Sequence, residues 1–311
     1  MSEPVFNRVA LIGLGLIGSS IARAARASGA AKEIVGTSRS EKTRKRVVEL
    51  GFLDEVLDTA GDAVKGADLV IICVPVRTSG AIAEAIGPFL AEGTIVTDVG
   101  SVKQSVVRDV EPHIPEGCFF VGGHPVAGTE HSGPDAGFAE LFQDRWCILT
   151  PADKSSTEAV EKLTAFWRAL GSNVDTMTPD HHDLVLAITS HIPHLIAYNI
   201  VGTVADLEHD TRSKVIQYSA SGFRDFTRIA ASDPTMWRDI FLANRDAVLE
   251  MLGRFSEDLS NLQRAIRRGE GDELFDLFTR TRNIRRNVIE AGQETAEPDF
   301  GRIRPISSDK D

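Results

Sequence analysis

The 311-residue chain has only three cysteines, Cys73, Cys118 and Cys147, and each lies in an apolar run. They are scattered, and none is spaced as a pair for a disulfide framework or a metal site. We therefore expect three buried free thiols.

Positive charge is also scarce, with 34 lysines and arginines against 45 acidic residues and a net charge of −11. Binding to nucleic acid needs a basic surface, so we do not expect that partner. The negative net charge does not exclude a small anionic substrate, because a site can be locally basic in an acidic protein. The first apolar run, residues 9–21, is interrupted by glycines and is too short to cross a bilayer. We expect a cytoplasmic protein with no membrane partner.

Hydrophobic residues make up 42% of the chain and charged residues 25%, as in an ordinary globular protein of this length with two domains. Apolar, strand-like runs alternate with helical patterns through the first half, which predicts a Rossmann-type, doubly wound α/β sheet. From Pro179 the pattern becomes helical. We predict three parts: a dinucleotide-binding domain at 1–178, a helical substrate and dimerisation domain at 179–292, and a polar tail at 293–311.

A glycine-rich turn follows the first strand, with the sequence GLGLIG at residues 13–18 and a helical pattern after it. In this motif the first glycine permits the tight turn, the second lets the backbone approach a pyrophosphate, and the third lets helix and strand pack closely. Because the motif stands between a strand and a helix, we favour dinucleotide binding over a chance glycine-rich turn. The residues predicted to contact the cofactor are Gly13, Gly15, Leu16, Ile17 and Gly18.

The end of the second strand, residues 33–37, bears on which dinucleotide is bound. An NAD-binding unit usually has an acidic residue there for the ribose hydroxyls. Here Ser38 and Arg39 follow the strand instead, and both are able to bind the 2′-phosphate of NADP. We assign the basic residues Lys45 and Arg46 to the solvated face of the next helix. The sequence predicts NADP or NAD as cofactor, with NADP favoured.

Three further segments follow predicted strands and would face one crevice at the carboxyl ends of the sheet. Val74 and Pro75 would line the cofactor, and Ser101 and His124 follow the next two strands. Ser101 also begins an S-x-x-Q pattern, which suits a helix N-cap, a substrate contact or both. His124 lies in the stretch GGHPVAG, which is either a solvent-facing turn or a loop that positions a catalytic base.

The second half of the chain contributes two more polar motifs. His191 and His194 lie three residues apart in an apolar helix, residues 182–204, which we expect to be buried and kinked at Pro193. A metal pair is one interpretation, but no ligands complete it, so one core histidine and one site histidine is favoured. Arg224, beside two phenylalanines, suits a carboxylate. Long amphipathic helices at 233–268 and 272–291 predict a second subunit.

With these motifs in place, the chain resembles the prephenate/arogenate dehydrogenase (TyrA, cyclohexadienyl dehydrogenase) family over nearly its full length. The resemblance rests on the segments at residues 13–19, 98–103, 123–128, 190–194 and 222–230. It implies a Rossmann domain followed by an all-helical dimerisation domain. It also implies oxidative decarboxylation of a cyclohexadienyl substrate in tyrosine biosynthesis, with hydride transfer from C4 to NAD(P)+ and no metal.

The family resemblance also assigns roles to individual residues. His124 would be the catalytic acceptor of a hydrogen bond from the C4 hydroxyl, and Ser101 would support that hydroxyl. Arg224 would bind a substrate carboxylate. His191 would sit at a substrate position, and Glu130 at the entrance of the site.

Two other functions stay open at this point. A β-hydroxyacid dehydrogenase of similar fold would carry a lysine on the first helix of its second domain, and residues 182–204 contain none. A non-catalytic NADP(H)-binding redox sensor would not need His124, Ser101 and Arg224 at one crevice. No residue distinguishes prephenate from arogenate, or tells whether tyrosine inhibits.

Overall fold

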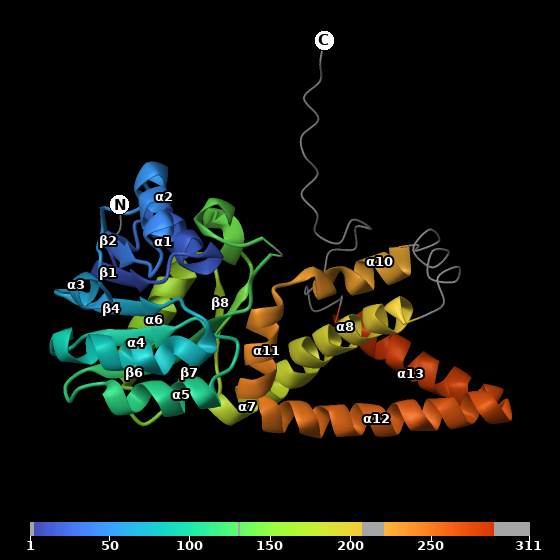
Figure 1. The fold of residues 1–311 in the computed structure, drawn as a ribbon. Coiled ribbons are helices and arrows are strands. Elements are labelled where there is room, and N and C mark those ends of the chain that lie inside the picture. The colour runs from blue at the N-terminus through green and yellow to red at the C-terminus, as the bar shows by residue number, and fades with distance from the viewer. Residues whose placement is uncertain (1–2, 130, 207–220, 289–311) are drawn as a thin grey trace, which may run out of the picture. The chain divides into compact units, whose positions relative to one another are not determined.

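The computed structural model describes residues 3–129, 131–206 and 221–288 (Figure 1). Glu130 and the predicted tail at 293–311 lie outside these residues. The chain forms two compact units, Met1–Met251 and Leu252–Asp311, and we describe each by itself. The domain boundary predicted at residue 178 falls within the first unit, between a strand and a helix, and stays a prediction.

The first unit is built on one eight-stranded sheet with the order β3-β2-β1-β4-β5-β6-β7-β8. The strands are β1 (Phe6–Ile12), β2 (Ala31–Thr37), β3 (Glu55–Val56), β4 (Leu69–Ile72), β5 (Ile95–Asp98), β6 (Phe119–Pro125), β7 (Trp146–Pro151) and β8 (Asn173–Thr176). The chain enters at β1 and builds outward in both directions, as a doubly wound sheet does. The predicted fold class is confirmed.

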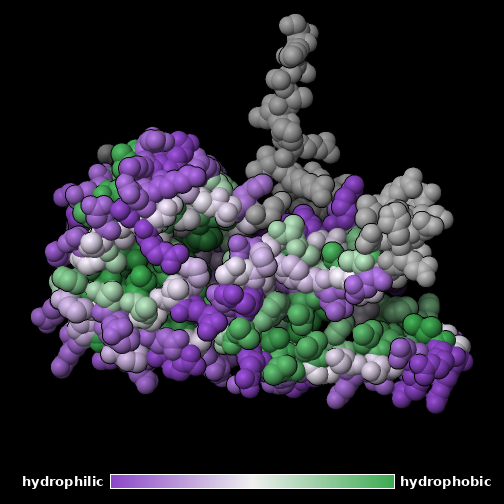
Figure 2. All heavy atoms as spheres, viewed as in Figure 1, coloured by the Kyte–Doolittle hydropathy of each residue, from purple (hydrophilic) through white to green (hydrophobic). Residues whose placement is uncertain are grey.

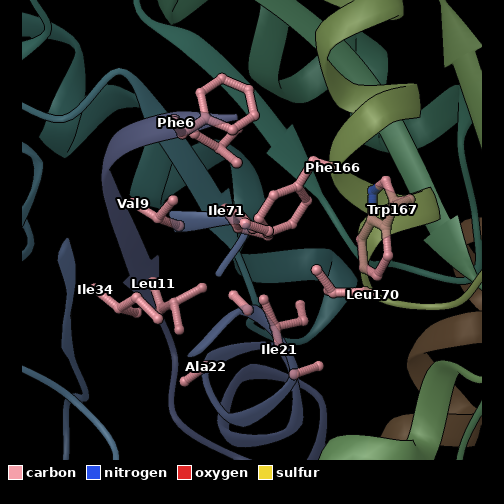
Figure 3. Packing of buried hydrophobic residues seen from close by; sticks show 14 of the residues in the cluster. Phe6, Val9, Leu11, Ile21, Ala22, Ile34, Ile71, Phe166, Trp167 and Leu170 are labelled. Carbon is pink, nitrogen blue, oxygen red and sulfur yellow. The ribbon is translucent and has the colours of Figure 1, made fainter. Parts of the chain in front are cut away.

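Helices cover both faces of this sheet. Those of the sheet region are α1 (Leu16–Ser28), α2 (Glu41–Leu50), α3 (Ala60–Val64), α4 (Ser79–Ile86), α5 (Gln104–Val110) and α6 (Thr157–Ala169). One apolar cluster joins α1 and α6 to the sheet through side chains such as Ile21, Phe166 and Trp167 (Figure 3). A second cluster joins α3, α4 and α5 to the opposite face. The result is three packed layers with the sheet in the middle.

Two strands, β7 and β8, run opposite to the other six and so depart from the expected parallel arrangement. β7 pairs antiparallel with β6, and β8 then pairs parallel with β7. The apolar run Trp146–Pro151 shows no direction by itself, because side chains alternate identically in both kinds of ladder. The antiparallel pairing has a consequence for the site, since it fixes His124 opposite Ile148 at the end of β6.

The helical part begins at Pro179. Its elements are α7 (Pro179–Leu186), a π-helical turn (Ala187–His191), α8 (Ile192–Ala205), α10 (Ser221–Thr227), α11 (Pro234–Ala243), α12 (Arg245–Arg268) and α13 (Gly271–Val288). The kink expected at Pro193 stays a prediction; a π turn, Ala187–His191, lies just before that proline. The helix expected at 233–268 is interrupted at Asn244, and the last helix begins at Gly271.

The segment Pro179–Ala205 is long and apolar enough, by length and composition, to cross a membrane, but only 28% of its apolar window is buried. The expectation of a fully buried helix is therefore wrong for this chain alone. Its buried side nevertheless carries the polar residues His182 and Asp183, which bind His124 and Lys103 of the sheet region, and His191, which contacts Asn244. Those hydrogen bonds identify it as a packed helix of the fold.

The second unit holds the C-terminal part of α12 together with α13. Its large apolar side chains are mostly exposed, among them Leu259, Ile266, Phe275, Phe278 and Ile284. Figure 2 shows hydrophobic surface along α12. An apolar stripe of this kind on a helix needs a covering surface.

Candidate active site

The glycine-rich turn between β1 and α1 has the geometry that a dinucleotide needs. Gly13 has a φ of +108°, and a Cβ there would lie 2.3 Å from the carbonyl oxygen of Cys73. A Cβ at Gly15 would meet nothing within 4 Å, so the turn is open on that side. Gly15 is the N-cap of α1 and provides no side-chain cap, which leaves the first N–H groups of the helix available to a phosphate.

The other predicted cofactor residues lie around this turn. Val74 follows β4 and stands close to Gly13, and Pro75 is exposed beside it. Leu16, Ile17 and Gly18 form the first turn of α1. Ser38 and Arg39 follow β2, the neighbouring strand. These residues fit a bound nicotinamide dinucleotide, with its pyrophosphate at the α1 N-terminus.

The Ser38–Arg39 segment is held by a second arginine. Arg44 donates from Nη1 to the carbonyl of Ser38 over 2.7 Å, and its Nη2 lies 3.3 Å from the carboxylate of Asp58. Arg39 is exposed and has no ion pair within the described ranges. Arg44 thus shapes the loop, whereas Arg39 makes no ion pair to a described residue.

His124 lies at the end of β6, with 7% of its surface exposed. A buried ion pair holds the strand there: Lys103 donates from Nζ to Asp98 over 2.5 Å and to the Gly123 carbonyl over 2.6 Å. Asp98 also accepts from the backbone N–H of Gly123. A Cβ at Gly123 would lie 2.8 Å from the Asp98 carbonyl oxygen, so glycine is needed for this close approach of β5 and β6.

A chain of three polar side chains leads from His124 into the helical part. Nδ1 of His124 lies 2.8 Å from Nε2 of His182, and Nδ1 of His182 lies 2.9 Å from Oδ1 of Asp183. The Asp183 carboxylate also accepts backbone N–H groups from Lys103, over 2.7 Å, and Gln104, over 2.9 Å. α7 is thereby fixed to the N-terminus of α5.

This arrangement revises the expectation for Ser101. The helix begins only at Gln104, and its first N–H groups are capped by Asp183 rather than by the Ser101 hydroxyl. Ser101 is half-buried in the loop before α5, and the next residue, Val102, packs against Trp237 of α11. An N-cap role for Ser101 is therefore wrong, while a substrate contact stays a prediction.

His191 and His194 occupy different environments, and the assignment of one to the core and one to the site stays a prediction. His191 is buried, its Nδ1 lies 3.1 Å from the side-chain amide of Asn244, and its Nε2 has no hydrogen-bond partner of normal geometry in the described residues. His194 is half-buried and stacks on Trp237 with the ring centroids 3.6 Å apart. In the described part of the chain no third ligand completes a metal site with this pair.

The buried histidines are held in their neutral forms. Burial lowers the pKa of His124 well below its ordinary value, and the neighbouring His182, Lys103 and His191 lower it further. Burial also lowers the pKa of His182 to about 2 and that of His191 to about 4. For His191, Asp183 and the Ser101 backbone act in the opposite direction. A neutral imidazole is the form that accepts a proton.

The arginine predicted to bind substrate is found on α10, which packs against α8. The Arg224 side chain is 67% exposed, with its Nε 3.9 Å from Asp225, so the guanidinium is accessible to an anion. Arg228 lies in the 3₁₀ turn that follows the helix, close enough to His194 to lower the pKa of that ring. Glu130, the predicted entrance residue, lies outside the described residues.

Sequence reasoning missed His182, Asp183 and Asn244, and it did not anticipate the buried Lys103–Asp98 pair. A signal was present: the dipeptide His182-Asp183 directly precedes an apolar helical run, and a carboxylate that is buried with such a run needs a partner. Asn244 had no such signal, because its role depends on the break between α11 and α12.

Comparison with known proteins identifies the family of this chain. Residues 21–176 match the family model described as prephenate dehydrogenase, nucleotide-binding domain. Residues 178–280 match the model described as prephenate dehydrogenase, dimerization domain. Together the two matches span most of the chain.

Individual relatives give the same result. The cyclohexadienyl dehydrogenase of Zymomonas mobilis is 45% identical over 281 residues, which cover 90% of this chain and 96% of that protein. The structure of prephenate dehydrogenase from A. aeolicus in complex with hydroxyphenyl propionate and NAD+ is 35% identical, with a TM-score of 0.84 over 91% of this chain and 98% of that one. Synechocystis arogenate dehydrogenase is 28% identical, with a TM-score of 0.78 over 90% and 99% of the two chains. The chain therefore belongs to the prephenate dehydrogenase family.

Proposed function

We propose that this dehydrogenase oxidatively decarboxylates prephenate, arogenate or both, with His124 as the catalytic proton acceptor. The observation that carries the proposal is the position of His124. It is a neutral, buried imidazole at the carboxyl edge of the same sheet that presents the glycine-rich turn. Substrates of this class fit a relative named cyclohexadienyl dehydrogenase and a similar structure named arogenate dehydrogenase.

When bound, the nicotinamide supplies a hydride acceptor. The protein's part begins with the C4 hydroxyl of the substrate, which donates a hydrogen bond to Nε2 of His124. Among the described residues the hydrogen bond of the His124 ring is the one between Nδ1 and His182, which leaves Nε2 for the substrate. As the hydride leaves C4, His124 draws on the hydroxyl proton and stabilises the developing carbonyl character.

That carbonyl character is the electron sink for the second bond that breaks. The bond between C1 and its carboxylate breaks, carbon dioxide departs, and the electron pair completes the aromatic ring. The product keeps a phenolic hydroxyl, so the proton lent to His124 returns to the oxygen and no net proton is released. His124 therefore needs to share a proton, which a neutral imidazole with one open nitrogen can do.

Other residues bind and orient the substrate. Ser101 would hold the same hydroxyl, Arg224 would pair with a carboxylate, and His191 would border the ring. Glu130 would lie at the entrance. The support for Ser101 and His191 is that they approach one another, and for Arg224 it is an exposed guanidinium on a helix packed against α8.

The test is an assay of the purified protein with each cofactor and each substrate, following the absorbance of the reduced nicotinamide. We expect turnover with prephenate or arogenate and none with a 3-hydroxyacid. Turnover of the 3-hydroxyacid alone would indicate a β-hydroxyacid dehydrogenase. Tight binding of cofactor with no turnover of any of these substrates would favour a redox sensor.

We further propose that NADP is the preferred cofactor, because Arg39 is positioned after β2 without an ion pair in the described ranges. Arg39→Ala should lower kcat/KM for NADP+ about tenfold or more, the usual weight of a charge-assisted contact, and leave NAD+ nearly unchanged. Lys42→Ala is the matched control, since Lys42 is an exposed cation three residues away. A wild-type preference for NAD+, or equal losses for both cofactors, would refute the preference.

We also propose that the protein is a cytoplasmic homodimer formed through its helical part. The support is the match of residues 178–280 to a dimerization domain and the apolar side chains left exposed there, including Ile200 and Val201 of α8 and Phe278 of α13.

A further inference from the structure

We propose that His182 and Asp183 are positioning residues that hold His124 in the tautomer whose Nε2 carries no proton. This inference rests on the proposed function, because it explains how His124 is kept ready as the proton acceptor. The juxtaposition that carries it is the hydrogen-bonded chain Asp183–His182–His124, which runs from the start of α7 to the end of β6.

The direction of each hydrogen bond is set at the Asp183 end. Two backbone N–H groups, of Lys103 and Gln104, point at its two carboxylate oxygens. Burial raises the pKa of Asp183, but these two donors and the Lys103 charge act against the rise and favour the ionised form. A carboxylate can only accept, so the proton between Asp183 and His182 belongs to Nδ1 of His182.

The second link follows from the first. His182 is neutral at physiological pH, because burial lowers its pKa to about 2. A neutral imidazole that carries its proton on Nδ1 has a bare Nε2, which can only accept. The 2.8 Å contact to His124 therefore requires a proton on Nδ1 of His124. The remaining nitrogen of His124, Nε2, is left with a lone pair for the substrate hydroxyl.

The same three hydrogen-bonded residues stabilise the charge that develops during the reaction. When His124 takes on part of the substrate proton, positive charge develops on its ring, and the Nδ1–H bond to His182 strengthens. The Asp183 carboxylate lies one imidazole away and favours that charge. Neither His182 nor Asp183 touches the substrate in this account; both act through His124.

The structure also prevents the rings of His182 and His124 from rotating. Asn244 donates to the backbone carbonyl of Asp183 over 2.8 Å. His182, Asp183 and His124 are all buried, and the His182 side chain has no exposed surface. An imidazole in such a position cannot flip its ring without breaking hydrogen bonds that nothing nearby replaces.

Asp183→Asn is the sharpest variant. An asparagine that turns its NH₂ group toward Nδ1 of His182 reverses both links and moves the His124 proton to Nε2, and it also loses the hydrogen bond that Oδ1 accepts from the Lys103 N–H. We expect kcat to fall by about 10²–10⁴, as in other sites where a base is held in the wrong tautomer, with KM for substrate and cofactor changed little. A kcat within about threefold of wild type would overturn the proposal.

A second pair of variants covers the possibility that Asp183→Asn weakens the fold. His182→Gln keeps an acceptor oxygen for Nδ1 of His124, whereas His182→Leu removes it. We expect His182→Gln to retain at least about tenfold more kcat than His182→Leu, at similar melting temperatures. Equal kcat values for the two variants would overturn the proposal. Ser156→Ala removes the N-cap of α6, which is not part of the Asp183–His182–His124 hydrogen-bond network. This variant is the control for loss of stability alone.

The direct readout needs no substrate. Nuclear magnetic resonance of protein labelled with ¹⁵N-histidine reports which ring nitrogen carries the proton. We expect the wild-type His124 to carry it on Nδ1, and Asp183→Asn to move it to Nε2. A wild-type His124 protonated on Nε2 would refute the tautomer. If the wild type turned over neither substrate, the proposed function would fail while this spectrum still decided the inference.

Discussion

The central residue, His124, combines two requirements that usually conflict. It must be buried enough to stay out of bulk water, yet its imidazole must exchange a proton with the substrate. The structure meets both because Nδ1 binds His182, while Nε2 makes no hydrogen bond to a described residue. Burial and the positive charge of Lys103 both oppose protonation of the ring, so the acceptor stays available in mildly acidic solution.

The pH dependence of kcat/KM should reflect this. The pKa of His124 is lowered by burial, by His182, by Lys103 and by His191, so the acceptor loses activity only when the pH falls well below the ordinary histidine value of about 6.5. We expect kcat/KM to stay level from neutral pH down through 6.5, with the acid limb below it. Because His124, His182 and His191 interact, the acid limb reports their coupled protonation and not that of one residue. An acid limb at or above 6.5 would contradict this description of the site.

At the scale of elements, the site depends on how β5, β6 and α5 are joined. The ammonium of Lys103 is fully buried between Asp98 at the end of β5 and the Gly123 carbonyl in β6. Its backbone N–H binds Asp183 of α7. One residue thus links the strand that carries His124 to the helix that orients it.

Lys103→Met should therefore be strongly destabilising, because it leaves the Asp98 carboxylate buried without its counter-charge. Loss of one partner of a buried ion pair typically costs about 3–5 kcal/mol of the free energy of unfolding. Chemical denaturation would measure it. Lys65→Met is the matched control: Lys65 pairs with Asp62 at the surface, and exposed pairs contribute less than about 1 kcal/mol. Similar losses for both variants would show that the buried pair has no special role.

Local sequence patterns predicted most of these elements, and the failures share a cause. β1, β4 and β5 contain short apolar runs, which are typical of buried strands, and the glycine-rich turn predicted the cofactor end of the sheet. The direction of β7 and the break at Asn244 depend on contacts distant in the chain, which no local pattern encodes. Asn244 is oriented by Asp183 and His191, residues more than fifty positions away.

Local sequence patterns also predicted only the part of the candidate site that does not depend on contacts distant in the chain. His124 was identifiable because glycines and a proline set it apart at the end of a strand. His182 and Asp183 were not, because their function appears only when α7 meets the sheet. Ser101 was assigned two roles from sequence, and the structure removes one of them by starting α5 at Gln104.

For the whole molecule, the exposed apolar side chains support the proposed homodimer. Phe278 of α13 is a large exposed apolar residue inside the segment that matches a dimerization domain. A charge placed at a buried interface position is costly, so Phe278→Asp should weaken the dimer roughly tenfold or more. Size-exclusion chromatography with light scattering would measure this.

The control for the dimer is Val48→Asp. Val48 is equally an exposed apolar residue, but it lies on α2, outside the matched segment. It should leave the dimer unchanged. A wild-type protein that is monomeric at micromolar concentration would disprove the assembly, and so would a Phe278→Asp variant as tightly associated as wild type.

The most direct test of the account as a whole is the kcat of His124→Asn. With substrate and cofactor saturating, removal of a proton acceptor should lower kcat by about 10²–10⁴, while the affinity for the cofactor stays that of wild type. The glycine-rich turn is unaffected by this change, so cofactor binding serves as the internal control. A kcat close to that of the wild-type enzyme would remove His124 from the reaction and contradict the account.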